Sequence, residues 1–538
     1  MRANKILRLF FGSSLTALAT ISWQEPVLES KTPFVLAAEN AQLANEGFRR
    51  CQDYVDGWLL LADPHSGLIP RNTKDQYWNA QDSAADNYPF MVLTTSFTNR
   101  EMYAGRMRQM LEAEIKLTSR IDALPDTYHF AEKGFAEGEP DLNRMIFGSS
   151  EYIKDGLLPM TEWLGHSPWS QRMISILDDM WKHAPVDTPF GRIVSNNVEV
   201  NGEMLQVLSR VYWMTSDAKY LQWAQRLGDY YLLGDQHPTK NFKTLRLRDH
   251  GCEIVSGLCE LYAAVHFAAP EKKKAYSKPI HEMLDRILEV GRNQHGMFFN
   301  SIDPQQGKQV GGGIADTWGY TLNGFYTVYL LDGTESYRAA TLQALSSINE
   351  HYRNYKWEGN SSDGYADSIE SALNLYNREP IASAGKWIDS EMQVMWAKQK
   401  SDGVIEGWHG DGNFARTTLM YCLWKTQGVS AHPWRRDLQF GAVGRDDTLF
   451  LSITAEADWN GKIHFDAIRH QSIMKLPLDW PRINQFPEWF CVDPAAEYRI
   501  QQDAVGKALV FKGTQLLEGV GFSVSGGKEL RLKIQRVK

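Results

Sequence analysis

One junction recurs along the chain every 50 to 66 residues, and it constrains the fold more than any other feature of the sequence. At each junction an apolar segment is followed by a short polar break and then by a helical pattern whose first turn carries an aromatic residue. A fixed period of this length is typical of a repeated supersecondary unit, and two helices with their connections fill it. The chain is therefore predicted to consist of helical hairpins. The aromatic markers are Tyr103, Trp169, Tyr220, Tyr276, Tyr337 and Trp387.

Two kinds of helical segment alternate along the chain. The first kind is apolar nearly all round, which is typical of a helix that is buried on every side. The second kind carries one apolar stripe and a polar back, as in residues 337–352. Buried helices that alternate with half-exposed ones predict an inner ring inside an outer ring. The apolar segments cover approximately residues 84–97, 150–164, 197–214, 250–268, 316–331 and 365–377.

The two ends of the helical region can close this ring. A first helix is predicted over residues 40–62, and a last one over about 412–427 can pair with it. The predicted fold class is mainly α, an (α/α)6 or (α/α)7 toroid of helical hairpins over residues 39–431. From about residue 436 the pattern changes to period-two alternation with β-branched residues and Gly, Asn and Asp turns. Residues 436–538 are therefore predicted to form a C-terminal antiparallel β domain similar to a sandwich.

The first residues have the pattern of a secretory signal. Arg2, Lys5 and Arg8 precede an apolar stretch that contains Ala17-Leu18-Ala19, an A-x-A-like cleavage site. Residues 1–38 are assigned to a signal peptide and N-terminal segment. We expect an exported bacterial protein, periplasmic or extracellular, that has no membrane attachment once the signal is removed.

Charge and cysteine content exclude several classes of function. The formal net charge of −8 argues against a nucleic acid as the main partner. Five cysteines are a low and odd number, so no disulfide framework is expected. The sequence has no CxxC or HExxH motif and no His-rich cluster, and neither a metal site nor a cofactor is predicted.

Polar loops lie directly before the apolar segments, and a closed ring would gather them at one end. They contain pairs of acids three or four residues apart, which share one helical face. Glycosidic hydrolysis needs one carboxylic acid to protonate the leaving oxygen and one carboxylate to activate water or attack the anomeric carbon. Acids in a first helical turn also complement the helix dipole, which is the structural alternative. The pairs are Asp82/Asp86, Glu199/Glu203, Asp249/Glu253 and Asp367/Glu370.

Further candidate groups lie in three of these loops, residues 246–253, 311–320 and 406–416. The short motif with the most ionisable side chains is Asp249-His250-Gly251, which Arg248 directly precedes. The candidate catalytic residues are Asp82, Asp249, His250, Asp316, Tyr320, Asp367 and Asp411. The candidate substrate-binding residues are Asp86, Asn197, Glu203, Arg248, Glu253, Trp318, Tyr365, Glu370, Trp408, His409 and Arg416. For Trp318, a sugar platform and a packing role are both open, and for Asn197 the alternative is helix capping.

The chain resembles the (α/α) toroid carbohydrate-active enzymes, which include the six-hairpin glycosidases and the toroid polysaccharide lyases. The resemblance rests on the alternation of inner and outer helices, the acid-rich loops before the inner helices, the secretory signal and the C-terminal β domain. The resemblance covers about residues 40–430 and implies a glycoside hydrolase, with a uronic-acid-containing poly- or oligosaccharide as the expected substrate and partner. In the glucuronyl hydrolases of this group, acids near inner-helix starts act on water, and Asp82, Asp86 and Asp367 occupy comparable places here.

Two other functions remain open at this point. A polysaccharide lyase would cleave a uronate linkage by β-elimination, and its Asn-His-Tyr-Arg set resembles Asn197, His250, Tyr320 and Arg416. A glycan-binding protein without catalysis would use the same scaffold. Hydrolysis is favoured because acids outnumber the other groups in the loops.

Overall fold

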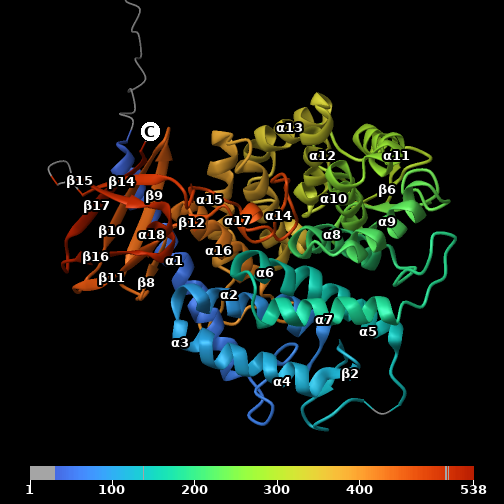
Figure 1. Ribbon diagram of the computed structural model, residues 1–538, viewed down its shortest axis with the longest axis horizontal. Coiled ribbons are helices and arrows are strands. Elements are labelled where there is room, and N and C mark those ends of the chain that lie inside the picture. Colours follow the sequence, from blue (N-terminus) through green and yellow to red (C-terminus); the bar gives the residue numbers. More distant parts are fainter. Residues whose placement is uncertain (1–30, 137, 503–505, 507, 538) are drawn as a thin grey trace, which may run out of the picture. The chain divides into compact units, whose positions relative to one another are not determined.

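The computed structural model describes residues 31–136, 138–502, 506 and 508–537, without the side chain of His250. The predicted signal segment lies almost entirely outside these residues. Residues 33–538 form one compact unit, which Figure 1 shows as a helical part and a β part. Within the described residues, no helix combines the length and the apolar character that are needed to cross a bilayer.

The helical part contains an inner ring. Each inner helix contacts the next one along the chain, and the last contacts the first, so the ring is closed. The inner helices are η1 (Ala80–Asn87) continuing into α2 (Tyr88–Thr98), α5 (Leu142–Glu151) continuing through η3 (Tyr152–Leu157) into α6 (Leu158–Leu164), α8 (Val198–Thr215), α10 (Glu253–Ala268), α12 (Trp318–Asp332), α14 (Ser362–Tyr376) and α16 (Asn413–Thr426).

Each inner helix packs against an outer one. The outer helices are α1 (Pro33–Leu60), α3 (Arg100–Met102) with η2 (Tyr103–Met107) and α4 (Arg108–Thr118), α7 (Pro168–Lys182), α9 (Ala218–Leu232), α11 (Pro270–Val290), α13 (Glu335–His351) and α15 (Ala382–Trp396). Helix α1 is the outer partner of α16, so the described residues form seven hairpins. The predicted toroid is confirmed in its seven-hairpin form. Residues 33–38, assigned above to the N-terminal segment, are the first turns of α1.

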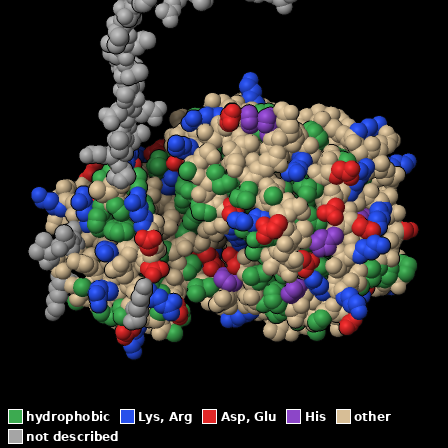
Figure 2. Space-filling model, turned by 90° about the horizontal axis from the view of Figure 1, so that it is seen from above, with side chains coloured by type: hydrophobic (Ala, Val, Ile, Leu, Met, Phe, Trp, Pro, Cys, Tyr) green, Lys and Arg blue, Asp and Glu red, His purple; other side chains and the backbone are tan. Residues whose placement is uncertain are grey.

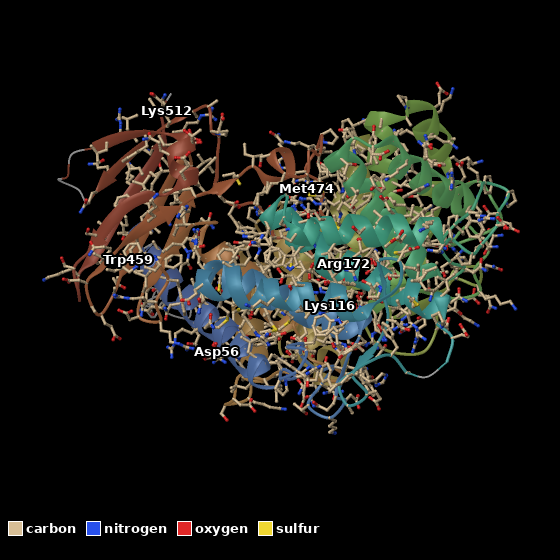
Figure 3. All side chains as sticks on the ribbon, turned by 60° about the horizontal axis from the view of Figure 1, so that its bottom comes forward. Asp56, Lys116, Arg172, Trp459, Met474 and Lys512 are labelled. Carbon is tan, nitrogen blue, oxygen red and sulfur yellow. The ribbon has the colours of Figure 1, made fainter. Side chains whose placement is uncertain are left out.

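The aromatic markers of the repeat join neighbouring outer helices. The hydroxyl of Tyr220 lies 3.0 Å from Asp178 of α7, and that of Tyr276 lies 2.7 Å from Asp229 of α9. Tyr337 makes the same bond to Asp285 of α11, at 2.8 Å. Nearer the N-terminus, an ion pair takes this place: Arg172, labelled in Figure 3, reaches from α7 to Glu114 of α4 at 2.6 Å.

Replacing Tyr276 by Phe tests this link. The ring is fully buried, and its hydroxyl donates to an acid, so we expect the free energy of unfolding to fall by about 1–3 kcal/mol. Urea unfolding measures the change. Tyr230→Phe is the matched control, because that hydroxyl has no hydrogen bond to any described residue and its removal should change little. Equal losses in the two variants would contradict a stabilising role for the repeated bond.

The C-terminal part is the predicted antiparallel β domain. One sheet has the strand order β15-β14-β17-β10-β9 and the other has the order β16-β11-β8. The bounds are β8 (Ser430–His432), β9 (Gln439–Arg445), β10 (Thr448–Thr454), β11 (Trp459–His464), β14 (Glu497–Gln502), β15 (Ala508–Lys512), α18 (Gly513–Glu518), β16 (Val520–Val524) and β17 (Glu529–Arg536). Helix α1 packs on β9 so closely that a Cβ at Gly441 would overlap the backbone nitrogen of Ala41.

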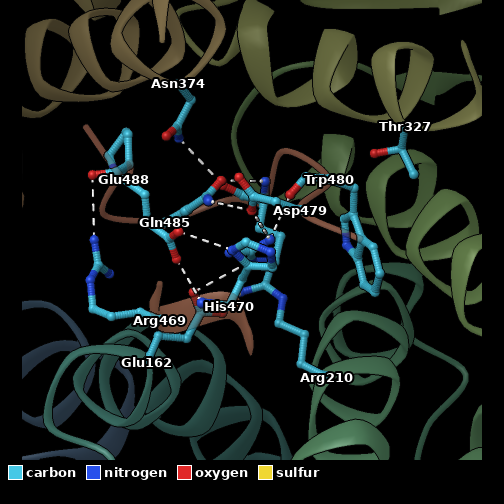
Figure 4. Close-up of polar contacts among 12 residues, drawn as sticks. Glu162, Arg210, Thr327, Asn374, Arg469, His470, Asp479, Trp480, Gln485 and Glu488 are labelled. Atoms are coloured by element: carbon cyan, nitrogen blue, oxygen red, sulfur yellow. Dashed lines mark hydrogen bonds and ion pairs between the residues drawn. The ribbon is translucent and has the colours of Figure 1, made fainter. Parts of the chain in front are cut away.

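Residues 466–490, which we call the strap, leave the β domain and run across the end of the inner ring. The strap contains β12 (Asp466–Ala467) and α17 (Arg469–Ser472), and Figure 4 shows its contacts with the inner helices. Trp480 donates to Glu260 of α10, and the Ile483 carbonyl accepts from Arg210 of α8. The strap therefore covers the ring from one end.

The remaining short elements belong to the loops between helices. They are β1 (Tyr77–Trp78), β2 (Ser119–Ile121), β3 (Leu124–Pro125), β4 (Tyr128–His129), β5 (Leu245–Arg246), η4 (Asp249–Cys252), β6 (Ser301–Asp303), β7 (Lys308–Gln309), η5 (Trp357–Asn360) and β13 (Cys491–Val492). Figure 2 shows acidic and basic side chains interspersed over the face drawn, with no large basic area, in keeping with the acidic net charge.

Candidate functional site

Two adjoining cavities lie at the N-terminal ends of the inner helices. The outer one, the cleft, has a volume of about 750 Å³ and the inner one, the chamber, about 70 Å³. The cleft is lined by Arg248, Asn300, Gly313, Ile314, Asp316, Tyr355, Lys356, Glu358, Gly359, Ser361, Ser362, Asp363, Glu406, Gly407, Trp408, His409 and Asp411. The chamber is lined by Asp86, Glu151, Lys154, Asp155, Asp249, Glu253, Thr317, Tyr320, Asp363, Asp367, His409, Asn413, Arg416 and Asn484. Because Asp363 and His409 line both, the cavities form one site.

Arg416 organises one wall of the chamber. Its Nη2 lies 2.6 Å from Oδ1 of Asp367, and its Nε lies 2.8 Å from Oε2 of Glu370. The hydroxyl of Tyr320 lies 3.0 Å from Asp367 and 2.8 Å from Glu370, and its single proton can serve only one of them at a time. Burial raises the pKa of Tyr320 well above its usual range, although Arg416 opposes this shift. Tyr320 is therefore a donor at neutral pH.

Three carboxyl groups near this wall bind protons more tightly than usual. Burial, reinforced by Asp367, raises the pKa of Asp316 to about 7. Burial also raises the pKa of Asp411 to about 6, against the opposing effect of His409. The pKa of Asp363 is raised as well, by burial and then by Asp367 and Asp411. Asp367, in contrast, is paired with an arginine, so the site brings together carboxyl groups in opposite electrostatic settings.

His409 lies between two acids that come from one wide helical turn. Its Nε2 is 3.7 Å from Asp82 Oδ1 and 3.7 Å from Asp86 Oδ2, both in the π-helical segment η1. Burial lowers the pKa of the imidazole, but Asp86 and Asp82 outweigh burial and the net pKa is raised. Arg71 holds the other oxygen of Asp82 at 2.6 Å. His409, which lines both cavities, thus joins the cleft to the acids of η1 by electrostatic attraction.

The floor of the chamber contains residues that the sequence analysis did not select. Lys154 of η3 lies 2.7 Å from Asp155 and 2.6 Å from Glu253. Asn484 of the strap donates to Asp155 at 2.7 Å. Lys154 and Asp155 could have been noticed as charges inside the apolar segment 150–164, and Asp363 lies in a loop already identified as polar. Asn484 has no local signal, because it comes from outside the helical repeat.

The structure also separates some predicted residues from the cavities. Trp318 is fully buried and donates to Ser368 at 2.9 Å, and Tyr365 is buried next to Lys398, so packing explains both positions better than sugar contact. Asn197 is the N-cap of α8, where its side chain accepts from the Glu199 nitrogen at 2.9 Å. Asn197 lines neither cavity, and its capping contact is the alternative that the sequence left open.

The other predicted residues lie at different depths in the site: some line the inner chamber and others line the outer cleft. Asp249, Glu253 and Asp367 line the chamber, whereas Arg248, Asp316, Trp408 and Asp411 line the cleft. Asp82, Glu203 and Glu370 are buried and line neither cavity. The side chain of His250 lies outside the described residues. Apart from these exceptions, the loops before the inner helices meet at one place, as the closed ring requires.

Comparison with known proteins gives distant structural matches only. No protein-family model matches the chain, and no curated protein matches it in sequence. An α-1,6-mannanase from Salegentibacter sp. HEL1_6 matches at a TM-score of 0.39 and 10% identity, over 70% of this chain and 98% of the mannanase. A family 88 glycosyl hydrolase from Bacteroides vulgatus matches at 0.38 and 12%, over 51% and 90% of the two chains.

A cellobiose 2-epimerase from Bacillus thermoamylovorans also matches, at a TM-score of 0.38 and 11% identity over 52% of this chain and 86% of the epimerase. The chain therefore has distant structural similarity to glycoside hydrolases and to an epimerase. The fold itself follows from the closed ring of hairpins and the antiparallel sheets described above.

Proposed function

We propose that this chain is a glycoside hydrolase that cleaves a poly- or oligosaccharide by carboxylate acid–base catalysis. The observation that carries the proposal is the contrast between Asp316 and Asp367 at one site. Asp316 is buried with a pKa of about 7, whereas Asp367 is paired with Arg416 at 2.6 Å. Glycosidic hydrolysis uses two carboxyl groups in different surroundings, one that holds a proton and one that acts as a carboxylate.

In this mechanism Asp316 is the acid and Asp367 the base. Asp316 transfers its proton to the glycosidic oxygen as the bond from that oxygen to the anomeric carbon breaks. A water molecule adds to the anomeric carbon, and Asp367 accepts the proton that this water loses. Arg416 holds Asp367 in place through an ion pair of 2.6 Å, and the Tyr320 hydroxyl lies within hydrogen-bonding distance of Asp367, at 3.0 Å.

The cleft supplies groups that suit a sugar chain. Trp408 is 85% exposed and lines the cleft, so its ring offers a free face for stacking on a sugar. Lys356 is exposed and forms no ion pair with any described residue, and its ammonium group can meet a uronate. These two groups support a uronic-acid-containing substrate. We also propose, from the pattern of its first residues, that the chain is exported.

β-Elimination has weaker support from the same residues. A lyase needs a group that removes the proton at C5, and burial raises the pKa of Tyr320 well above 10. Asn197, the expected neutraliser of the uronate, caps α8 at a position that lines neither cavity. Hydrolysis, in contrast, uses Asp316, whose pKa is raised to about 7, and Asp367, which is paired with Arg416.

Product analysis tests the reaction class. On uronate-containing oligosaccharides, the purified protein is expected to release reducing ends without the ultraviolet absorbance of an unsaturated uronate. Absorbance that rises in step with the reducing ends would replace hydrolysis by elimination. Binding without release of either product, unchanged in Asp316→Asn and Asp367→Asn variants, would indicate a glycan-binding protein.

A further inference from the structure

At the floor of the chamber lies a group of acids that the proposed mechanism does not use. Glu151, Asp155 and Glu203 come from α5, η3 and α8, and all three are buried. One oxygen from each lies within 4.8 Å of one from each of the others. Glu203 is the most unusual member, because it is fully buried and neither of its oxygens has a hydrogen-bond partner among the described residues.

The charge at this place is not balanced by the protein. Glu199 and Glu253 lie beside the three acids and add to the negative potential, and the pKa of Glu203 is raised first by burial and then by Asp155. Lys154 is the cation within reach among the described residues, and it already bonds Asp155 and Glu253. An isolated buried carboxylate is costly, so the excess charge requires bound protons or a bound cation.

We propose that Glu151, Asp155 and Glu203 form a binding site for a hard divalent cation, Ca²⁺. A Ca²⁺ ion takes oxygen ligands at about 2.3–2.6 Å, so ligand oxygens on its opposite sides lie up to about 5 Å apart. The spread of the three carboxylates fits this range. All the ligand atoms are carboxylate oxygens, which suit Ca²⁺ rather than a metal that prefers nitrogen or sulfur.

The position of the site gives an ion a route and a structural effect. Glu151 and Asp155 line the chamber, which adjoins the open cleft, so an ion can enter from solvent. The ion would bridge inner helices that are neighbours in the ring. It would also neutralise the excess charge that Lys154 leaves uncompensated, so the floor under the substrate would become more rigid.

Calcium titration of the full chain tests the site. After treatment with a chelator, the protein is expected to bind Ca²⁺ in calorimetry at pH 8, and Ca²⁺ is expected to raise its thermal midpoint. Glu203→Gln should weaken the affinity for Ca²⁺ by more than about tenfold. Even the loss of a residue that only hydrogen-bonds a metal ligand typically lowers the metal affinity about tenfold or more. Asp155→Asn is the second variant, for use if Glu203→Gln fails to fold.

The matched control is Glu391→Gln. Glu391 of α15 is also fully buried, has one unpartnered oxygen and has a pKa raised by burial, but it is not part of this cluster. Its replacement should leave Ca²⁺ binding unchanged. If the wild type does not bind Ca²⁺, the proposal is wrong, and protons bound by the carboxyl groups neutralise their charge instead. Binding that survives in both Glu203→Gln and Asp155→Asn would also overturn it, since the ion would then lie elsewhere.

Discussion

Replacing Asp316 by Asn is expected to lower kcat by about 10²–10⁴-fold, the usual contribution of a general acid. The amide has nearly the shape of the carboxyl group but cannot supply the proton that the leaving oxygen needs. Substrate binding should be affected much less, so KM is expected to change little. Steady-state kinetics on the substrate found by product analysis measure both constants. Asp446→Asn, at an exposed turn between β9 and β10, is the control and should behave as the wild type.

The pH profile gives this prediction a second readout. Asp316 must be protonated to act, so kcat of the wild type should fall as the pH rises through about 7. The variant should lose this limb, and its residual rate should not follow the titration of Asp316. A variant that keeps both the rate and the alkaline limb would remove Asp316 from the mechanism.

Stability should change in the opposite direction to activity. The folded-state pKa of Asp316 is raised, so the folded protein binds this proton more tightly than the unfolded chain does. The protonated Asp316 therefore contributes favourably to the free energy of unfolding at low pH, and this contribution is lost as the pH rises through about 7. At pH 8 and above, Asp316→Asn removes a buried charge and is expected to raise the free energy of unfolding by about 2–4 kcal/mol.

The helical ring could be predicted because its signal is local and repeated. Three of the markers, Tyr220, Tyr276 and Tyr337, lie near the start of an outer helix, and the hydroxyl of each bonds an acid of the preceding outer helix. The same contact therefore places a tyrosine at the same position in three successive hairpins. The pairing of α1 with α16 follows from ring closure and needs no local signal.

The site could be located from the sequence, but only part of its composition could be identified. Acids of the loops, such as Asp316 and Asp367, were found because polar residues stand out before apolar helices. Trp318 was ambiguous, because a tryptophan in such a loop can pack or bind, and here it packs against Ser368. Lys154 lies in a π-helical turn whose width changes which residues face the ring centre.

Asn484 shows a different kind of limit. It reaches Asp155 from the strap, across 329 residues of sequence, and its backbone nitrogen donates to Glu370 at 2.6 Å. No periodicity links a loop of the β domain to the floor of a helical ring. Only the folded arrangement shows that the β domain contributes to the site.

The buried polar contacts beneath the strap lead to the largest expected effect on stability. Arg210 of α8 is 1% exposed and lies between two acids of neighbouring inner helices. Its Nη1 is 3.2 Å from Glu162, and its Nη2 is 2.6 Å from Glu260. It also donates to the Ile483 carbonyl of the strap, so this one side chain links α8 to α6, to α10 and to the strap. Figure 4 labels Arg210 and Glu162 beside the strap.

Arg210→Ala is expected to lower the free energy of unfolding by about 3–5 kcal/mol, because it leaves buried carboxylates with too little positive charge. Arg482, which lies 3.4 Å from Glu162, compensates only in part. Urea unfolding measures the loss, and faster amide exchange in the strap should accompany it. Arg192→Ala is the control, since its exposed pair with Asp187 contributes about 0–1 kcal/mol. A loss in Arg210→Ala no larger than in this control would show that the strap and the ring are held together by packing rather than by the arginine.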